Sequence, residues 1–543
     1  VSEKKYDFNI RSSLRLQYKI IEGLDLSTSV SVDYSQSEGN NFTPSTLDGV
    51  NGLSITMGAK QSNMMLQNEN LLHYKFSLRE RHNFDWLFGF SYTRDSQNRM
   101  NGRAKGAPSD YIHYAVDGMP SIKDLGGTLT AMQSFVSDYY EKIMVSYFGR
   151  VAYNFDQKYL MEFTLRRDGS SVFGKDVRWA TFPSVALGWN FSDEAFMKNF
   201  WWLNHGKLRG SWGTSGQVFQ NAYLAQGVID VGNEFLGVTG MVPAQLANTN
   251  LTWEKSEQYD LGLDVDLFDY RLKLKADYYY KYTKSMLWQL SLPGTVYMHQ
   301  RQWQNAIECS NQGVELEAQI DILRDTEIKW RARFNISHND NRLEKTYSGQ
   351  DVDEKYVIGK SVYELRAFKT DGYVQNIDEV PVYWDQNGNK VLLGDGGVVN
   401  SIRPGMKKIV DLNGDGRITD DDLYFAGSTL PVVYGGISSE IKWKQFDLSV
   451  LFNYSLGRHI INAFNKGSLN FSETSLGAIF EDYRNVTFWE KEGDTPDYPI
   501  IDVAYKYYNG QYDARTDDNI ETVNFLRLKQ LTIGYNLPSD IAK

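Results

Sequence analysis

Residues 433 to 454 alternate between apolar and polar side chains with a period of two. Successive side chains of a β-strand point to opposite faces, so this pattern predicts two strands with one apolar and one polar face. A two-residue turn at Lys444 and Gln445 pairs Trp443 with Phe446 and brings the apolar positions of both arms onto one face. The residues expected on that face are Ile437, Ile441, Leu448, Val450 and Phe452.

The length of the two arms indicates what the apolar face contacts. Each arm has about ten residues, whereas a strand that crosses a membrane needs about 9–11 and strands of globular proteins average about 5–6. Lipid is therefore the expected environment of the apolar face. The polar positions are expected to face the interior of a barrel, and they include Glu440, Asp447, Asn453, Asp264 and Lys273.

The same alternation recurs along the chain and predicts about fifteen strands. They cover residues 14–20, 24–34, 72–78, 84–92, 147–155, 159–165, 185–191, 208–212, 259–267, 272–280, 314–322, 328–336, 433–443, 446–454 and 525–535. The last strand is the least regular, and the residues expected on one of its faces are Phe525, Arg527, Lys529, Leu531, Ile533 and Tyr535.

The connections between these strands alternate between short turns and long loops. The long connections are expected at residues 35–70, 93–141, 214–256, 283–310, 340–432 and 457–523, and the segment Val362–Val374 is placed within the fifth. Outer-membrane barrels have short turns on one side and long loops on the other, whereas soluble sandwiches have shorter strands. The predicted fold is therefore all-β, a large antiparallel transmembrane β-barrel.

Composition narrows the class of protein further. Of the 543 residues, 14% are aromatic. The mean hydropathy is −0.47, and the sequence contains no apolar run long enough for a helix that spans a membrane. A formal charge of −11 argues against a nucleic-acid partner. Cys309 is the only cysteine, which excludes a disulfide framework and a cysteine metal cluster.

The stretch DLNGDGRITDDD, residues 411–422, has the spacing of an oxygen-ligand metal loop. Positions 1, 3, 5, 7, 9 and 12 of such a loop supply ligands to Ca²⁺, position 7 through its carbonyl, and position 6 is glycine. Here Gly416 occupies position 6. The candidate ligands are Asp411, Asn413, Asp415, Arg417, Thr419 and Asp422. The alternative is an acidic, glycine-rich turn that binds no ion.

Candidate sites for substrate or partner are aromatic residues expected in long loops, where large rings bind with little loss of entropy. They are Trp288, Tyr297, Trp303, Tyr383 and Trp384. The alternative is that they pack one loop against another. The run Arg166-Arg167-Asp168 is interpreted as a structural charge pair. No HExxH motif is present, no GK[ST] follows Gly213-Thr214-Ser215-Gly216, and no enzyme activity is expected.

Seven stretches of the chain have a distinctive sequence, and most of them cover predicted strands. They are YFGRVAYNFDQKYLMEFTLRRDGSSVFG (147–174), WATFPSVALGW (179–189), KLRGSWGTSGQ (207–217), WEKSEQYDLGLDVDLFDYRLKLKADYYYKYT (253–283), NQGVELEAQI (311–320), DLNGDGRITDDD (411–422) and FLRLKQLTIGYNLP (525–538). In combination they resemble the barrel of SusC/RagA-type TonB-dependent transporters. The resemblance implies a barrel of about 22 strands around a plug. We therefore expect the plug, about four strands before Val1 and about three after Lys543 to lie outside this chain.

The resemblance also implies a function. Such proteins import glycans or peptides across the outer membrane of Gram-negative bacteria, together with a SusD-like surface lipoprotein and with energy from the TonB complex, which contacts the plug region. We expect import of an oligomeric nutrient, a glycan in preference to a peptide. The alternative is a non-energised porin or an adhesion and binding scaffold, and a plug with a TonB-contacting segment upstream would distinguish the two.

Overall fold

The structure is a computed structural model. It describes residues 1–47, 53–107, 109–113, 122–123, 129–130, 133–219, 221–235, 238–291, 301–352, 356–379, 382–384, 390–392, 404–414, 420–462, 487–497, 499–500 and 516–537. Among these residues, no helix is both long enough and apolar enough to cross a bilayer.

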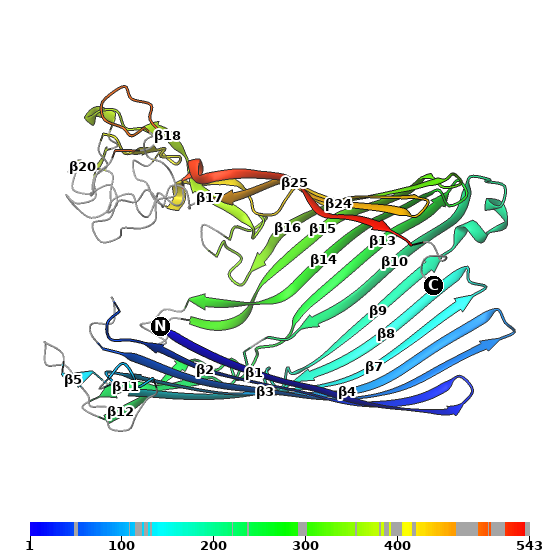
Figure 1. The fold of residues 1–543 in the computed structure, drawn as a ribbon, viewed down its shortest axis with the longest axis horizontal. Coiled ribbons are helices and arrows are strands. Elements are labelled where there is room, and N and C mark those ends of the chain that lie inside the picture. The colour runs from blue at the N-terminus through cyan, green and yellow to red at the C-terminus, as the bar shows by residue number, and fades with distance from the viewer. Residues whose placement is uncertain are drawn as a thin grey trace. The chain divides into compact units, whose positions relative to one another are not determined.

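Within the described residues, fifteen strands form one antiparallel sheet and follow one another in chain order (Figure 1), which confirms the predicted number and sequence of strands. They are β1 (Ser2–Ile21), β2 (Leu24–Thr43), β3 (Ile55–Leu78), β4 (His82–Lys105), β7 (Gln133–Phe155), β8 (Tyr159–Ser170), β9 (Trp179–Trp189), β10 (Leu203–Gln217), β13 (Glu254–Leu267), β14 (Leu272–Ser291), β15 (Arg301–Leu323), β16 (Ile328–Thr346), β23 (Val433–Trp443), β24 (Phe446–Ile461) and β25 (Ile520–Tyr535).

The remaining strands are short and pair two by two outside this sheet. The pairs are β5 (Ile122–Lys123) with β6 (Leu129–Thr130), β11 (Val228–Phe235) with β12 (Val238–Gln245), β17 (Glu364–Phe368) with β22 (Leu423–Ser428), β18 (Thr370–Tyr373) with β21 (Lys407–Ile409), and β19 (Val382–Trp384) with β20 (Lys390–Leu392). The segment Val362–Val374 thus contributes no strand to the main sheet, as predicted.

The short turns force several non-glycine residues into the left-handed region of backbone conformation. Arg79 and Glu80 have φ of 52° and 59°, and Asp156 and Gln157 have φ of 50° and 59°. Such a conformation costs energy in an L-residue and persists only where the flanking structure imposes it. The paired strands on either side impose it here, and Lys444, with φ of 52°, lies in the turn predicted between β23 and β24.

The strands are longer than the hydrophobic pattern predicted. β3 and β4 each have 24 residues and stay paired from Leu78 and His82 out to Ile55 and Lys105. The prediction of loop structure was therefore wrong for residues 35–43, 55–70, 93–105 and 133–141, which belong to β2, β3, β4 and β7. Their side chains are mostly polar on both faces, and backbone hydrogen bonds extend a sheet without any apolar side chain.

The alternation predicted for the last strand was wrong over its first half. The pairing of β24 with β25 shifts between Leu451, which lies opposite Gln530, and Phe452, which lies opposite Leu528. The extra residue, Lys529, forms a bulge, and a bulge moves the following side chains to the other face. The residues that share the apolar face are consequently Leu526, Leu528, Leu531, Ile533 and Tyr535.

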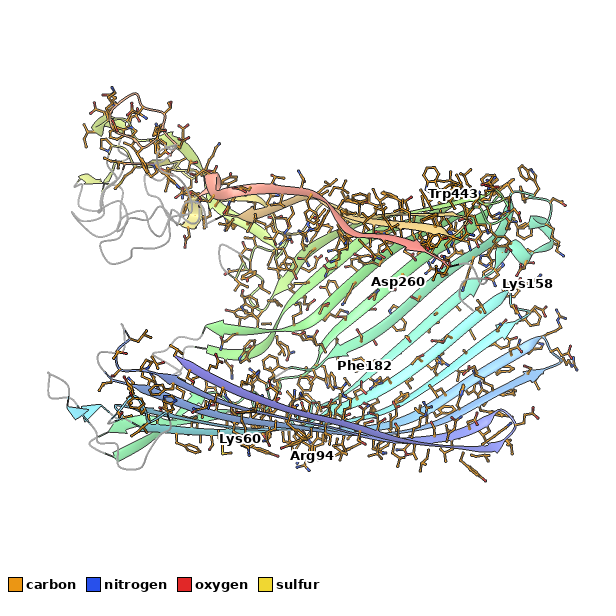
Figure 2. The ribbon with its side chains drawn as sticks, in the orientation of Figure 1. Lys60, Arg94, Lys158, Phe182, Asp260 and Trp443 are labelled. Carbon is orange, nitrogen blue, oxygen red and sulfur yellow. The ribbon has the colours of Figure 1, made fainter. Side chains whose placement is uncertain are left out.

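The chain divides into two compact units. The first contains residues 1–190, 209–259 and 283–306, and the second contains residues 191–208, 260–282 and 307–543. In the first unit, Phe173, Ala180, Phe182 and Trp253 form a buried cluster (Phe182 is labelled in Figure 2). Trp253 Nε1 donates a hydrogen bond to the Arg178 carbonyl at 2.8 Å, so the polar N–H of this buried ring has a hydrogen-bond partner.

In the second unit, the connections between the long strands form a folded region of their own, termed here the loop subdomain. It consists of the described residues of 362–379, 404–414, 420–428 and 487–500, which include strands β17, β18, β21 and β22. Its buried apolar side chains include Ala367, Phe368, Val374, Met406, Ile409, Leu423 and Trp489. The loop subdomain therefore has its own small core.

Candidate functional site

The polar face of the sheet in the first unit carries charged side chains that bridge neighbouring strands. Asp85 on β4 lies at the centre of one group. Its Oδ1 is 2.9 Å from His73 Nε2 and 3.1 Å from Arg150 Nη2, and its Oδ2 is 3.3 Å from Lys75 Nζ. The group spans β3, β4 and β7, so charged side chains of three neighbouring strands meet on this face.

The second unit repeats this arrangement on its polar face. Arg331 Nε lies 2.6 Å from Asp321 Oδ1, and Arg333 Nη1 lies 2.6 Å from Glu440 Oε1. Glu440, which was expected to face a barrel interior, shares its face with Arg331 directly opposite in β16. Both arginines stand on alternate positions of β16, so the polar positions of β15, β16 and β23 gather on one side.

The apolar face of the second unit is built from rows of residues that lie opposite one another in β16, β23, β24 and β25. The register places Trp443 opposite Phe446, Ile441 opposite Leu448, and Ile437 opposite Phe452, as the hairpin pattern predicted. The rows run Ile328–Trp443–Phe446–Tyr535, Trp330–Ile441–Leu448–Ile533, Ala332–Ser439–Val450–Leu531 and Phe334–Ile437–Phe452–Leu528.

Aromatic rings cluster at the turn end of this apolar face. The ring centroids of Trp443 and Phe446 are 6.3 Å apart, and those of Phe446 and Tyr535 are 4.8 Å apart (Trp443 is labelled in Figure 2). All three side chains are about half exposed, at 48%, 50% and 52%. A soluble protein would bury a row of this kind, whereas membrane strands carry aromatic girdles at the two interfaces. Contact with lipid remains a prediction for these residues and for the five named from the sequence.

Two of the candidate aromatic residues lie in strands rather than in loops. Trp288 belongs to β14 and Trp303 to β15, so the loop expected at 283–310 was wrong over much of its length. Trp303 is half-buried, packs on Phe219 with ring centroids 5.0 Å apart, and borders the cluster of Leu224, Ala225 and Leu251. Trp303 therefore packs against neighbouring side chains in this structure, and a role of Trp288 or Trp303 toward a substrate or a partner stays a prediction.

The other three candidate aromatic residues are placed less fully. Tyr383 and Trp384 belong to the short strand β19, which pairs with β20. Tyr297 lies outside the described residues. A role of these residues toward a substrate or a partner therefore stays a prediction.

The acidic loop begins after β21 and ends where β22 begins, within the loop subdomain. Asp422 is fully buried, and its Oδ1 accepts hydrogen bonds from the backbone N–H of Leu412 at 2.9 Å and of Asn413 at 3.4 Å. Asp411 Oδ1 accepts from the N–H of Gly414 at 2.7 Å. These bonds close the loop on its own backbone, and they are compatible with the ion-free turn as well as with a metal loop.

Three of the six predicted ligands, Asp415, Arg417 and Thr419, lie outside the described residues. Among the residues that the structure does describe, no group of three or more histidine, cysteine, aspartate or glutamate side chains is arranged to hold a metal ion. The described oxygens are carboxylates of the kind that calcium prefers. Calcium binding accordingly stays a prediction.

Sequence reasoning missed the residues that hold the loop subdomain to the start of β25. Asp517 Oδ1 accepts from the N–H and hydroxyl of Thr370 at 3.1 and 2.6 Å, and Asp517 Oδ2 accepts from the Tyr424 hydroxyl at 3.0 Å. Burial raises the pKa of Tyr424, and the hydrogen bond to Asp517 acts in the same direction. Nearby, the ammonium of Lys407, which is only 4% exposed, lies 3.2 Å from Asp518 Oδ2.

These partners are separated by about a hundred residues or more along the chain, and no local pattern connects them. The available signal was the run Asp517-Asp518-Asn519 directly before a strand, which is a common composition for a turn. The run Arg166-Arg167-Asp168, by contrast, was interpreted correctly. Arg166 Nε lies 2.8 Å from Asp168 Oδ1, which makes a structural charge pair.

Comparison with known proteins agrees with this architecture. The family model described as TonB dependent receptor-like, beta-barrel matches residues 2–359. TonB-dependent receptor P3 of Formosa agariphila is 32% identical over 553 residues, which cover 99% of this chain and 52% of that protein. TonB-dependent receptor SusC of Bacteroides thetaiotaomicron is 30% identical over 410 residues, which cover 72% of this chain and 38% of that protein. The chain spans about half the length of the curated relatives it matches, at 52% for three of them.

Solved structures with a similar fold include the RagAB peptide transporter, with a TM-score of 0.75 and 23% identity, over 99% of this chain and 56% of that one. The RagAB peptide importer in the open-open state also has a TM-score of 0.75, with 22% identity, over 100% of this chain and 56% of that one. At this level of identity the likeness concerns the fold.

Proposed function

Because the chain belongs to the family of TonB dependent receptor-like β-barrels, we propose that the protein imports an oligomeric nutrient across the outer membrane, with energy from TonB and with a SusD-like surface lipoprotein. The nutrient is a glycan in preference to a peptide. The barrels of this family are outer-membrane proteins, and the protein resides in the outer membrane of a Gram-negative bacterium.

The observation that carries this proposal is the separation of the sheet into an apolar and a polar face. Apolar rows that cross four neighbouring strands and end in Trp443, Phe446 and Tyr535 suit a lipid boundary with an interfacial aromatic belt. The opposite face carries charge pairs such as Arg333 with Glu440, which suit a water-filled interior. A wide barrel with such an interior can conduct a solute larger than a single sugar or amino acid.

The requirement for energy follows from the width of the barrel. A barrel of about 22 strands, the size that the family resemblance implies, encloses a lumen that a plug has to close. Moving a plug requires work, and the outer membrane holds no ATP. The energy source is therefore a partner in the inner membrane, which for this family is the TonB complex.

The lipoprotein in this proposal docks on the side of the long connections. The loop subdomain has its own core and is tied to the start of β25 through Asp517 and Lys407, so it offers a formed surface to a partner. A stable partner of this kind buries on the order of 2,000 Å² or more. Glycans are favoured as cargo because the polar face carries amide and guanidinium groups, such as those of Gln319 and Arg333, to which sugar hydroxyls can form hydrogen bonds.

The decisive experiment measures uptake in cells. The gene is deleted, and oligosaccharides and peptides are supplied one by one as the limiting nutrient. Uptake of at least one oligosaccharide should be lost, should return with the intact gene, and should stay lost when the intact gene is supplied to cells that lack TonB. If no oligosaccharide or peptide depends on the gene, import is refuted. Uptake that persists without TonB would replace the energised transporter with a porin.

A further inference from the structure

A hollow of about 560 Å³ lies in the first unit. It is found where the first strands are farthest from the short turns at residues 22–23 and 79–81. Its lining comes from five consecutive strands of the sheet, β1, β2, β3, β4 and β7. The volume falls within the range of about 300–1,000 Å³ that is usual for sites that bind small molecules. Residues 99–103, which supply the part of the lining that comes from β4, were expected to be loop, and sequence reasoning therefore did not identify the site.

The strand register shows how the hollow forms. Three rows of residues cross the polar face from β1 to β7, and the middle row contains small residues where its neighbours contain larger ones. The rows are Glu3–Asn41–Met57–Arg103–Ser134, Lys5–Gly39–Ala59–Asn101–Val136 and Asp7–Ser37–Gln61–Arg99–Asp138. Gly39 and Ala59 form the floor, and a Cβ atom added at Gly39 would meet no atom within 4 Å. The glycine is thus not required by packing, and it leaves open space.

Two arginines on β4 border this floor, one on each side of Asn101. Neither Arg99 nor Arg103 forms an ion pair with a carboxylate of the described residues, although Asp138 lies opposite Arg99 and Glu3 lies in the row of Arg103. With its amide oriented to suit its neighbours, Asn101 accepts a hydrogen bond from Arg99 Nε at 3.0 Å. Both arginines are exposed.

Cations on the other face of the same strands behave differently. Lys60 Nζ lies 2.8 Å from Glu38 Oε1, and Arg94 Nε lies 2.8 Å from Glu141 Oε2 (Lys60 and Arg94 are labelled in Figure 2). Within the hollow, Lys5 is likewise paired, with Asp7 at 3.1 Å. Arg99 and Arg103 are thus the two lining cations that the described chain leaves without a carboxylate partner.

We propose that this hollow is a binding subsite for a carboxylate-bearing unit of the oligomer that the protein imports, held between the Arg99 and Arg103 guanidinium groups. A guanidinium presents a planar fork of N–H donors that matches a carboxylate in two parallel hydrogen bonds. The two arginines stand four residues apart on one strand, about 13 Å, so one unit of an oligomer can lie between them over the small floor residues. Asn41, Gln61 and Ser37 supply neutral hydrogen-bond partners for the rest of the unit.

This inference rests on the proposed import function, and the test separates the two. The intact protein is purified from outer membranes, and its binding to three probes is measured: an oligogalacturonate, a neutral maltooligosaccharide with the same number of units, and a hexaglutamate peptide. The wild-type protein should bind at least one of the two carboxylate-bearing probes more tightly than the neutral probe. The probe that binds, sugar or peptide, identifies the source of the carboxylate.

Arg99→Gln and Arg103→Gln should each weaken binding of that probe by about tenfold to a hundredfold, as expected for loss of a hydrogen bond to a charged group. Binding by the wild-type protein should also weaken as sodium chloride is raised, because the groups are exposed. Arg15→Gln, which removes a cation from the same face of β1 outside the hollow, is the matched control and should bind as wild type. Heat-dependent mobility in gel electrophoresis verifies that each variant is folded.

Wild-type affinity in the folded double variant would overturn the inference, as would failure of the wild-type protein to bind either carboxylate-bearing probe. If the wild-type protein nevertheless binds the neutral probe, or uptake of a neutral oligosaccharide depends on the gene, the import function stands and only the subsite is refuted. If no oligomer is bound and none is taken up, both are refuted.

Discussion

At the scale of single residues, the two faces of the sheet differ in how much each side chain contributes to the stability of the fold. Ion pairs such as Arg331 with Asp321 are partly exposed, at 43% and 13%, and exposed pairs of this kind contribute about 0.2–1 kcal/mol. Transfer of a large apolar side chain out of water contributes about 1.5–3 kcal/mol of stabilising free energy. We therefore expect the apolar rows to determine which face of the sheet meets lipid, and the ion pairs to have a smaller effect on the other face.

Replacement of Val450 by arginine tests the lipid-facing assignment. Val450→Arg should reduce the free energy of unfolding by about 2–4 kcal/mol if the site lies at the membrane midplane. The neighbouring Ser449 points to the polar face, so Ser449→Arg should have a much smaller effect. Urea unfolding in lipid vesicles measures both. Equal stability of the two variants would contradict lipid contact at Val450.

The turn at Asp156 should respond to acid. The Arg81 guanidinium donates hydrogen bonds to Asp156 and lowers the pKa of that carboxyl below its usual value. A lowered pKa in the folded state means that the contribution to stability is complete above the ordinary carboxyl pKa of about 3.9 and is lost as the pH falls through the folded value. Amide hydrogen exchange at residues 155–158, corrected for intrinsic rates, should therefore accelerate below about pH 4. Asp156→Asn should abolish this pH dependence. If the variant shows the same dependence of exchange on pH as the wild-type protein, the role of the Asp156 carboxyl is refuted.

At the scale of elements, a strand is decided by pairing as much as by its own pattern. β25 carries two sets of apolar residues with opposite parity, Leu526 and Leu528 before the bulge and Leu531 and Ile533 after it. Neither set alone predicts the whole strand. The bulge at Lys529 reconciles them, because one extra residue restores the second set to the face of the first.

Deletion of Lys529 should therefore be more harmful than its substitution. Without the bulge, one half of β25 must turn its leucines to the polar face, and each leucine contributes roughly 1.5–3 kcal/mol when it leaves water. Insertion into the membrane, followed by heat-dependent gel mobility, should fall strongly for the deletion. Lys529→Ala keeps the extra residue and should insert as wild type. Normal insertion of the deletion variant would show that the bulge has no such role.

The acidic loop makes a second prediction at this scale. If Ca²⁺ binds with an affinity of about 10⁻⁴–10⁻³ M, as in many extracellular modules, added calcium should protect residues 407–428 from protease, and a chelator should remove the protection. Asp411→Ala should eliminate the difference between calcium and chelator while leaving the main sheet folded. Asp378→Ala, in an exposed position of the same subdomain, is the control. A wild-type protein that is cleaved equally under both conditions would establish the ion-free turn.

At the scale of the whole molecule, two long connections assemble into one structure. The first supplies Thr370, Lys407 and Tyr424, and the second supplies Asp517 and Asp518, which bind them immediately before β25. The contacts of residues 487–497 with Gln375 and Tyr373 belong to the same assembly. The loop subdomain is thus a preformed surface rather than a set of separate loops.

Removal of that surface should release the lipoprotein partner and spare the barrel. β16 and β23 pair directly from Ile328 and Trp443 to Ser337 and Tyr434, and β16 continues to Thr346, about 30 Å beyond Ser337. A flexible glycine-serine linker of about fifteen residues in place of residues 347–432 can span this distance and should leave their register intact. The variant should insert normally. Affinity purification should recover a surface lipoprotein with the wild-type protein and lose it with the variant. Absence of any lipoprotein from the wild-type preparation would refute the partner itself.

The sequence by itself determined the features that depend on local periodicity. The period of two predicted the fifteen strands and their order, and the turn at Lys444 and Gln445 set the register of β23 with β24, because side-chain direction and tight turns are local properties. The family resemblance rested mostly on the same strands and turns, together with the acidic loop at residues 411–422.

Only the tertiary structure decided where strands continue without an apolar pattern, as in β3 and β4, and where a bulge reverses the pattern, as at Lys529. It also placed Trp303 in a packed cluster and brought Thr370 to Asp517, 147 residues away. The three rows of residues around Gly39 likewise became visible only once the register of the strands was known. Backbone hydrogen bonds pair strands regardless of side chain, and contacts between distant residues depend on the register of every strand between them, so neither leaves a local signal in the sequence.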